Sequence, residues 1–247
     1  MRLFSLFAFA AFLFASCATV GSPPASKFFL DPKVRSLAEA AASGDIAKLD
    51  RLVSAGVSVN AMGRGQVTSL MWALLHQNKK GLAFLLAHGA DPNVQLTEDF
   101  DELLIEGVST MSYAAQHKDS WYLKEVLSRG GNPNLVNSVR SQTPIMAAIG
   151  SMRPENVRIL ISAGANLDWQ DRDGRTAMMA ATTLNQYELI CAMLEAGADP
   201  KLRKRWGTSI VSDIKVIRTD PKSEQWKWRA KVIERLIALG IDFEHER

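Results

Sequence analysis

Cysteine and histidine are scarce in this sequence, and their scarcity excludes several kinds of protein. The chain of 247 residues holds two cysteines and four histidines. A disulfide scaffold needs more cysteines, and a structural zinc site needs Cys and His residues at close, regular spacing. The four histidines lie singly along the chain. We therefore expect no disulfide framework, no metal site and no cofactor.

An excess of charge of one sign is also missing. Lys and Arg total 29 against 26 Asp and Glu, which leaves a net charge of +3 at pH 7. Proteins that coat nucleic acid usually carry a dense basic excess, so we expect no nucleic-acid partner. The hydrophobic content of 47% is enough for one sizeable domain, or at most two small ones.

Long apolar runs are absent except at the N-terminus. Leu3 to Phe14 are apolar apart from Ser5, and they follow a positive start at Met1-Arg2. The run is shorter than the roughly 20 apolar residues that span a bilayer. Its length and flanks are typical of the hydrophobic region of a secretory signal peptide.

The apolar run ends in the sequence Leu-Phe-Ala-Ser-Cys17, which resembles a bacterial lipobox, although Phe14 stands where Leu is usual. The resemblance implies cleavage before Cys17 and lipidation, including palmitate, of that residue. It makes residues 1–16 a signal peptide and 17–32 a lipidated cysteine with a flexible tether. Ala18 in place of Asp implies delivery to the outer membrane, on the periplasmic side. An ordinary signal peptide cut nearby is the alternative.

The rest of the chain repeats one unit. A phrase such as Ala-Gly-Ala-Asp-Pro at 196–200 occurs in six versions, whose leading glycines are Gly56, Gly89, Gly130, Gly164, Gly197 and Gly240. The separations are 33, 41, 34, 33 and 43 residues, so three gaps hold a period near 33 and two contain insertions. Each glycine follows an apolar stripe at helical spacing and suits the left-handed residue that commonly ends a helix.

A second phrase, Thr-x-x-x-x-Ala, precedes the glycine phrase. It begins at Thr68, Thr143 and Thr176, with a degenerate copy from Ser109. Thr ahead of Pro or a small residue caps a helix start, and the alanine lets that helix lie close to its neighbour. The two phrases predict two helices in each unit.

The two phrases recur together with a period near 33 residues. This pattern resembles the ankyrin repeat over roughly residues 33–245. The resemblance implies an all-α dominated ankyrin-repeat solenoid of about six helix-turn-helix units, with β-hairpin tips and atypical end caps. The expected units are 33–61, 62–93, 94–134, 135–168, 169–201 and 202–245.

Catalytic motifs are absent from the sequence. It contains no Gly-x-Ser-x-Gly elbow, no phosphate-binding Gly-rich loop with Lys and no His-Glu-x-x-His. The stretch Asp171 to Gly174 resembles the start of a calcium loop but lacks the later bidentate acid. It falls where ankyrin units carry Asp-x-x-Gly in the hairpin. We expect no catalytic residues and no enzymatic activity.

Ankyrin domains generally bind proteins through hairpin tips and the concave side of the first helices. Carried over to this chain, the tip residues are Arg64, Arg140, Arg172, Asp173, Arg175, Arg205 and Trp206. The helical positions are Leu75, His76, Gln116, His117, Gly150, Ser151, Thr183 and Leu184. The tip row is basic, and Arg and Trp are favoured interface anchors, which suggests an acidic partner surface. The alternative is that these charges only keep the hairpin edge soluble.

Three other features lie outside the repeat pattern. The insertion 98–106 mixes acids with apolar residues, so Phe100, Asp101 and Glu102 either contact the partner or fold back over the groove. Lys and Arg flank the apolar residues of an amphipathic helix around Val232, which we expect to cap the core. Cys191 is expected to be a partly buried, inert thiol.

The lipoprotein signal narrows the function. The chain resembles periplasmic ankyrin immunity lipoproteins, which neutralise lipase effectors delivered by type VI secretion. The resemblance implies a periplasmic protein-binding lipoprotein, anchored to the outer membrane by lipid at Cys17, that binds and inhibits a toxic, phospholipase-type secreted effector. A periplasmic ankyrin scaffold or oxidative-stress protection factor is the alternative.

Overall fold

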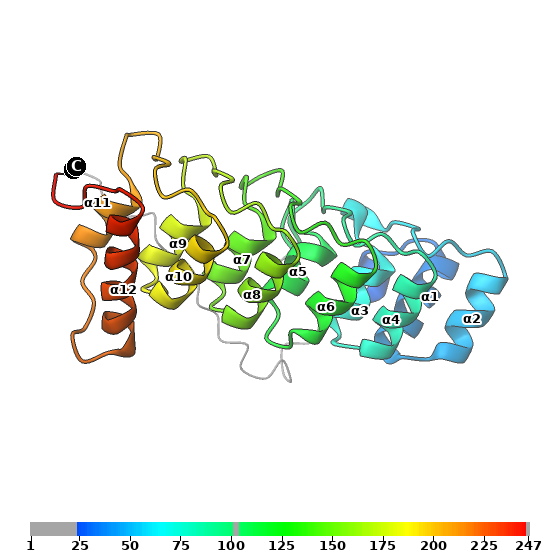
Figure 1. The fold of residues 1–247 in the computed structure, drawn as a ribbon. Coiled ribbons are helices and arrows are strands. Elements are labelled where there is room, and N and C mark those ends of the chain that lie inside the picture. The colour runs from blue at the N-terminus through cyan, green and yellow to red at the C-terminus, as the bar shows by residue number, and fades with distance from the viewer. Residues whose placement is uncertain (1–23, 101–103, 246–247) are drawn as a thin grey trace.

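The computed structural model describes residues 24–100 and 104–245, which form a row of helix pairs (Figure 1). The signal peptide, Cys17, Asp101 and Glu102 lie outside the described residues. Figure 1 shows two layers of helices, with the loops between units projecting on one side. None of the helices in the described chain has both the length and the apolar character of a membrane span.

Each unit consists of an inner helix followed by an outer helix. The inner helices are α1 (Pro32–Ser43), α3 (Ser69–Leu75), α5 (Thr110–Gln116), α7 (Pro144–Gly150), α9 (Ala177–Thr183) and α11 (Ile210–Val216). The outer helices are α2 (Ile46–Ser54), α4 (Lys79–Ala87), α6 (Trp121–Ser128), α8 (Pro154–Ser162), α10 (Tyr187–Glu195) and α12 (Glu224–Ala238). Each inner helix packs against the inner helix of the next unit, which confirms the predicted solenoid.

The tips between units are turns rather than paired strands. Single antiparallel bridges join Met62 to Thr68, Gln95 to Ser109 and Arg203 to Ser209, and no strand forms in the part of the chain described. A short 3-10 helix, η2 (Arg64–Gln66), occupies the tip of unit two. The expected β-hairpins are therefore reduced to one bridge at most.

The predicted helix caps form at three of the inner helices. The hydroxyls of Thr68 and Thr176 accept hydrogen bonds from backbone N–H groups three residues ahead, at 3.1 and 3.4 Å. Ser109 and Ser112 form a reciprocal capping box. Thr143 was wrongly predicted to cap α7, because its buried hydroxyl has no hydrogen-bond partner and Pro144 opens the helix instead.

The six repeated glycines end the outer helices as predicted, with φ between +78° and +92°. At Gly89 no atom lies within 4 Å of the place where a Cβ would stand. Its left-handed conformation, not lack of space, therefore requires glycine there.

A ladder of asparagines joins successive units. Asn60 Nδ2 donates to the carbonyl of Gly89 at 2.9 Å, and its Oδ1 accepts from the Asp91 N–H at 2.8 Å. Asn93 and Asn134 make the same pair of bonds to the units that follow them. Each amide side chain therefore fixes the register between two glycine phrases.

The ladder is incomplete at the end of unit four, where Asp168 replaces asparagine. Its carboxylate accepts from the Asp199 N–H at 2.8 Å but has no N–H to donate to the Gly197 carbonyl. We expect Asp168→Asn to raise the free energy of unfolding by about 0.5–1.5 kcal/mol, the net value of one hydrogen bond. Urea unfolding measures the change. The reverse exchange, Asn134→Asp, should destabilise, and equal stability of both variants would contradict this role.

The described part of the expected tether, residues 24–32, is folded, so that prediction is wrong. The side chains of Phe28 and Phe29 are fully buried beside η1 (Ala25–Lys27). The Phe28 ring lies 5.3 Å from the ring of Trp72, and Arg35 Nε donates to the Phe29 carbonyl at 3.0 Å. The two rings cover apolar surface of unit two, so this segment is the N-terminal cap of the solenoid.

Helix α12 closes the other end of the solenoid, as its amphipathic pattern predicts. Val232 and Leu236 are fully buried, and α12 packs against α10. Trp228 is partly buried against the core, with Lys231 Nζ 4.1 Å from its ring centre. The prediction that this helix caps the core is confirmed.

Candidate protein-binding surface

Three tips present an exposed arginine at the same position. Arg64, Arg172 and Arg205 each lie four residues before the capping Thr or Ser of an inner helix, and all are exposed. Unit four has Val139 at this position, followed by the exposed Arg140. The basic row predicted from the sequence therefore lies along the tips.

The tips of units five and six are bonded to each other. The backbone N–H of Arg205 donates to the Asp173 carbonyl at 3.0 Å, and Arg205 Nη1 donates to the Arg172 carbonyl at 3.1 Å. A Cβ on Gly174 would lie 2.8 Å from Arg205 N, so the two tips touch through their backbones. Arg172 and Arg205 are thus held in a fixed relation, with the 66%-exposed Trp206 beside them.

Arg175 and Asp173 are less available than the sequence suggested. Arg175 Nε donates to Asp171 Oδ2 at 3.0 Å, and Arg175 Nη2 lies 3.5 Å from Asp173 Oδ2. The side chain of Asp171 is only 6% exposed and also accepts from backbone N–H groups of its own loop. These bonds make the loop an ankyrin tip, and the described residues hold no cluster of metal-ligating side chains.

Lys204 does not contribute a free charge to the basic row. Its Nζ bonds to Asp213 Oδ1 at 2.7 Å, and the two side chains are 13% and 15% exposed. Arg140 and Arg172 have no carboxylate partner among the described residues. The accessible positive charge of the C-terminal tips therefore comes from arginines and from the exposed Lys201.

A small cavity opens beside these tips, between α7 and α9. Its volume is about 70 Å³, and its lining includes Met146, Gly150, Arg175, Ala180, Thr183 and Leu184. The structure thus brings the tip residue Arg175 together with the predicted helical positions Gly150, Thr183 and Leu184. Met146 and Ala180 were missed because a single unit gives no sign that they line a space between two units.

The two predicted contact histidines differ in exposure. His76 is exposed, and its Nδ1 lies 2.9 Å from the carbonyl oxygen of Trp72. His117 is only 3% exposed, and its Nδ1 accepts a hydrogen bond from the Asp119 N–H at 3.0 Å. The chain becomes extended at His117, and the ring packs 4.5 Å from that of Tyr122. The prediction that His117 contacts a partner is therefore wrong.

His117 should make stability depend on pH. Burial lowers the pKa of His117 below its ordinary value of about 6.5. Below that pH the unfolded chain binds a proton that the folded chain excludes, so stability falls as pH drops from 7 to 5. His117→Asn keeps an acceptor for the Asp119 N–H and should flatten this dependence in urea unfolding at pH 7, 6 and 5. Asp119, whose pKa is lowered mainly by Lys79, titrates below this window. Equal slopes for the two proteins would exclude His117 as the cause.

The insertion folds back on the N-terminal end instead of forming a helix over the groove. Arg64 Nη2 lies 2.9 Å from Glu98 Oε2, and Arg64 Cζ is 5.4 Å from the Phe100 ring centre. The Phe100 ring lies 5.0 Å from that of Phe28. Arg64 and Phe100, which were predicted as partner contacts, are therefore engaged within the chain, and of the two alternatives for the insertion the described part folds back.

Cys191 is buried and has no disulfide partner among the described residues. Burial raises the pKa of the Cys191 thiol, which disfavours the reactive thiolate. The predicted burial is confirmed, and the raised pKa agrees with an unreactive thiol.

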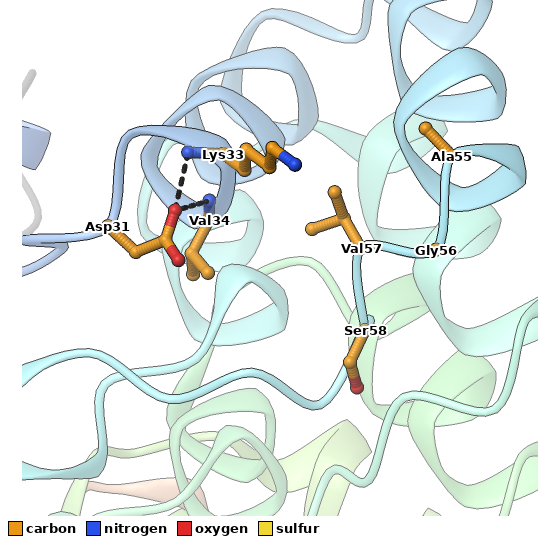
Figure 2. A pocket seen from close by; sticks show the side chains of 7 residues that line it. All are labelled: Asp31, Lys33, Val34, Ala55, Gly56, Val57 and Ser58. Atoms are coloured by element: carbon orange, nitrogen blue, oxygen red, sulfur yellow. Dashed lines mark hydrogen bonds between the residues drawn. The ribbon is translucent and has the colours of Figure 1, made fainter.

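A larger cavity of about 200 Å³ lies at the N-terminal end of the solenoid. Figure 2 shows Asp31, Lys33 and Val34 on one side of it and residues 55–58 on the other. Asp31 Oδ1 accepts from the Lys33 N–H at 2.7 Å, so the helix start is already satisfied. No group of side chains converges there on a common point, and the tips of units five and six are toward the far end of the molecule (Figure 1).

A curved stack of helix pairs with exposed tips defines a protein-binding repeat scaffold. Residues 111–204 match the family model for ankyrin repeats in three copies. The chain is 32% identical over 170 residues to Protein PhlB from Serratia liquefaciens, covering 66% of this chain and 68% of that protein. The chain belongs to the ankyrin-repeat family, whose members bind other proteins.

Other relatives share the repeats but little else. The human mitochondrial disaggregase is 28% identical over 211 residues, which cover 82% of this chain and only 28% of that protein. The crystal structure of an ankyrin repeat domain from Acinetobacter baumannii AYE has a TM-score of 0.66 and 24% identity, covering 83% of this chain and 97% of that one. The structural likeness establishes the fold alone.

Proposed function

We propose that this protein is a periplasmic lipoprotein that binds and inhibits a toxic secreted enzyme of the phospholipase type. Its main support is the exposed, mutually fixed pair of Arg172 and Arg205 beside Trp206. The backbones of the two tips are held together, and the Arg205 side chain is held by the Arg172 carbonyl, before any partner arrives, so less conformational freedom is lost on binding. A basic, preorganised edge suits an acidic rim on a partner.

The N-terminal sequence supports the location. The lipobox-like sequence ends at Cys17, and six residues separate it from Pro24, where the described chain begins. The seven peptide steps from Cys17 to Pro24 can span at most roughly 25 Å, so a lipid at Cys17 would hold the N-terminal cap near the membrane. The tips of units five and six, with Arg172 and Arg205, lie toward the other end of the solenoid, where a partner could reach them (Figure 1). Similarity to a Serratia protein agrees with a bacterial setting.

Inhibition would follow from occlusion. Arginine guanidinium groups form short, charge-assisted bonds to carboxylates, and complementary charge speeds association. A rigid edge seated over the mouth of an active site excludes substrate without any chemistry by the inhibitor. No catalytic residue of this chain is needed.

The test uses the chain from residue 18, tagged and incubated with envelope and secreted fractions. We expect capture of a single hydrolase at fixed stoichiometry, whose activity is lost when the purified chain is added. Cys17→Ser in the full chain should abolish palmitate labelling and release the protein from the outer membrane. A diffuse set of envelope proteins, or no partner, would contradict inhibition and favour a scaffold or stress-protection role.

A further inference from the structure

The concave surface differs between the two halves of the solenoid. Four residues after each capping residue, units two and three carry Trp72 and Tyr113, whereas units four and five carry Ala147 and Ala180. The two aromatic side chains are 3% and 7% exposed and fill the space at this position. The two alanines are partly exposed, and Ala180 lines the cavity between α7 and α9.

Unit six closes this space in another way. The equivalent residue there is Asp213, whose carboxylate bonds to Lys204 at 2.7 Å. Rings therefore fill the position in units two and three, and an ion pair fills it in unit six. The cavity, which we call the notch, is defined by Met146, Gly150, Ala180, Thr183 and Leu184.

The wall of the notch offers apolar surface and few free polar groups. Thr183 Oγ1 donates to the Met179 carbonyl at 3.1 Å, so its hydroxyl is already satisfied. The guanidinium of Arg175 is paired with Asp171 at 3.0 Å, and its aliphatic stem is available as a rim. Gln142 also lines the notch, and an apolar group entering it would meet mainly apolar surface and would leave the bonds of Thr183 and Arg175 intact.

The size of the notch restricts what can enter. Its volume of about 70 Å³ equals the space of roughly two water molecules in the liquid. A branched aliphatic tip fits such a space, whereas an aromatic ring does not. The exposed Arg172 belongs to the same tip as Arg175, and the side chain of Arg205 donates a hydrogen bond to the Arg172 carbonyl.

We propose that the notch receives one aliphatic side chain, of the size of leucine, from an acidic loop of the partner protein. This assignment rests on the proposed function, because it names the segment that the enzyme would present. The arginines at the tips bind the acidic flanks of the loop, while the notch holds the side chain at its centre.

The test uses fluorescein-labelled heptapeptides of sequence Asp-Glu-Gly-X-Gly-Glu-Asp, with X as Leu, Ala or Trp. Fluorescence anisotropy with the chain from residue 18 should show leucine binding about tenfold more tightly than alanine, and tryptophan no better than alanine. Ala180→Trp replaces the alanine in the wall of the notch with the larger side chain that unit two carries at Trp72, which should cover the opening of the notch. It should abolish the preference for leucine and keep the salt-dependent binding common to all three peptides.

Ala147→Trp is the matched control, since it makes the same change one unit earlier, outside the notch. It should keep the leucine preference. Gly150→Leu fills the notch from α7 with the side chain that unit two has at Leu75, and it should act like Ala180→Trp. Circular dichroism and thermal unfolding confirm that each variant folds.

Three results would each contradict the proposed role of the notch. The first is equal binding of the leucine and alanine peptides, and the second is no binding of any peptide at millimolar concentration. The third is a leucine preference that persists in both Ala180→Trp and Gly150→Leu. The peptides need no enzyme, so this failure is distinct from failure of the proposed function. The latter would appear as absence of a captured hydrolase, whatever the peptides do.

Discussion

The variant Gly81→Ala is expected to lower the free energy of unfolding by at least about 3 kcal/mol. Gly81 lies in the first turn of α4, and a Cβ there would overlap the carbonyl oxygen of Ala41 and lie 2.7 Å from its carbonyl carbon. The obstructing atoms belong to the backbone of α1, so only a movement of α4 away from α1 can relieve the overlap. That movement would open the core between units one and two.

The expected sign is opposite to that for an exposed helix, where alanine is favoured over glycine by about 1 kcal/mol. Thermal unfolding followed by circular dichroism should show a midpoint lower by roughly 6–12 °C, at 2–4 °C per kcal/mol for a chain of this size. Gly89→Ala is the control, because it strains a residue at φ +83° in open space and should cost about 1–2 kcal/mol. A loss for Gly81→Ala no greater than for Gly89→Ala would show that close helix packing does not set the stability here.

Gly81 also shows what a repeat pattern leaves undetermined. The period near 33 and the two phrases predict which residues begin and end helices, because caps and left-handed ends are local properties. The distance between α1 and α4 is not local. At the equivalent place in unit four, Asn156 Nδ2 donates to the carbonyls of Ala115 and His117 at 2.9 and 2.8 Å. The equivalent position is therefore a glycine in unit two, where backbone packs against backbone, and an asparagine with a buried side-chain amide in unit four.

The residues of the candidate surface also fall into those that the repeat pattern predicts and those that depend on contacts between distant parts of the chain. Arg172 and Arg205 could be predicted because the register of the repeat places them on tips, and a tip is exposed in any ankyrin unit. Whether Arg64 and Phe100 are free to bind a partner could not be predicted from the repeat. It depends on Glu98 and on the N-terminal cap, which lie outside the repeat pattern. The sequence predicts a tether where the structure has the N-terminal cap, because a proline and serine run precedes the two phenylalanines.

The notch could have been found from the sequence by comparing units with one another. Each unit alone shows an alanine that suits close helix packing. Only the change from Trp72 and Tyr113 in units two and three to Ala147 and Ala180 in units four and five, at one register, indicates that part of the concave face is open. Differences between repeats therefore carry information about binding that the consensus of the repeats hides.

Reversal of both tip charges, Arg172→Glu with Arg205→Glu, is expected to weaken binding of the captured enzyme by about 100-fold or more. Each substitution replaces an attraction to an acidic surface with a repulsion, and the two residues lie on bonded tips, so their effects are coupled. Calorimetry measures the affinity, and hydrolase assays should show activity restored at inhibitor concentrations that silence it with the original chain. The remaining affinity should depend less on salt.

The control for this reversal changes net charge equally on the outer layer, with Lys80→Glu and Lys124→Glu. Lys80 is exposed at the start of α4, and Lys124 makes only a 3.6 Å exposed ion pair with Glu155, so neither should affect folding much. Affinity should change by less than about threefold, because charges separated from the interface by more than a Debye length of about 8 Å are largely screened. Equal losses for the two double variants would assign binding to net charge rather than to the tips. An unchanged affinity for the tip variant would move the binding surface to the face formed by the inner helices.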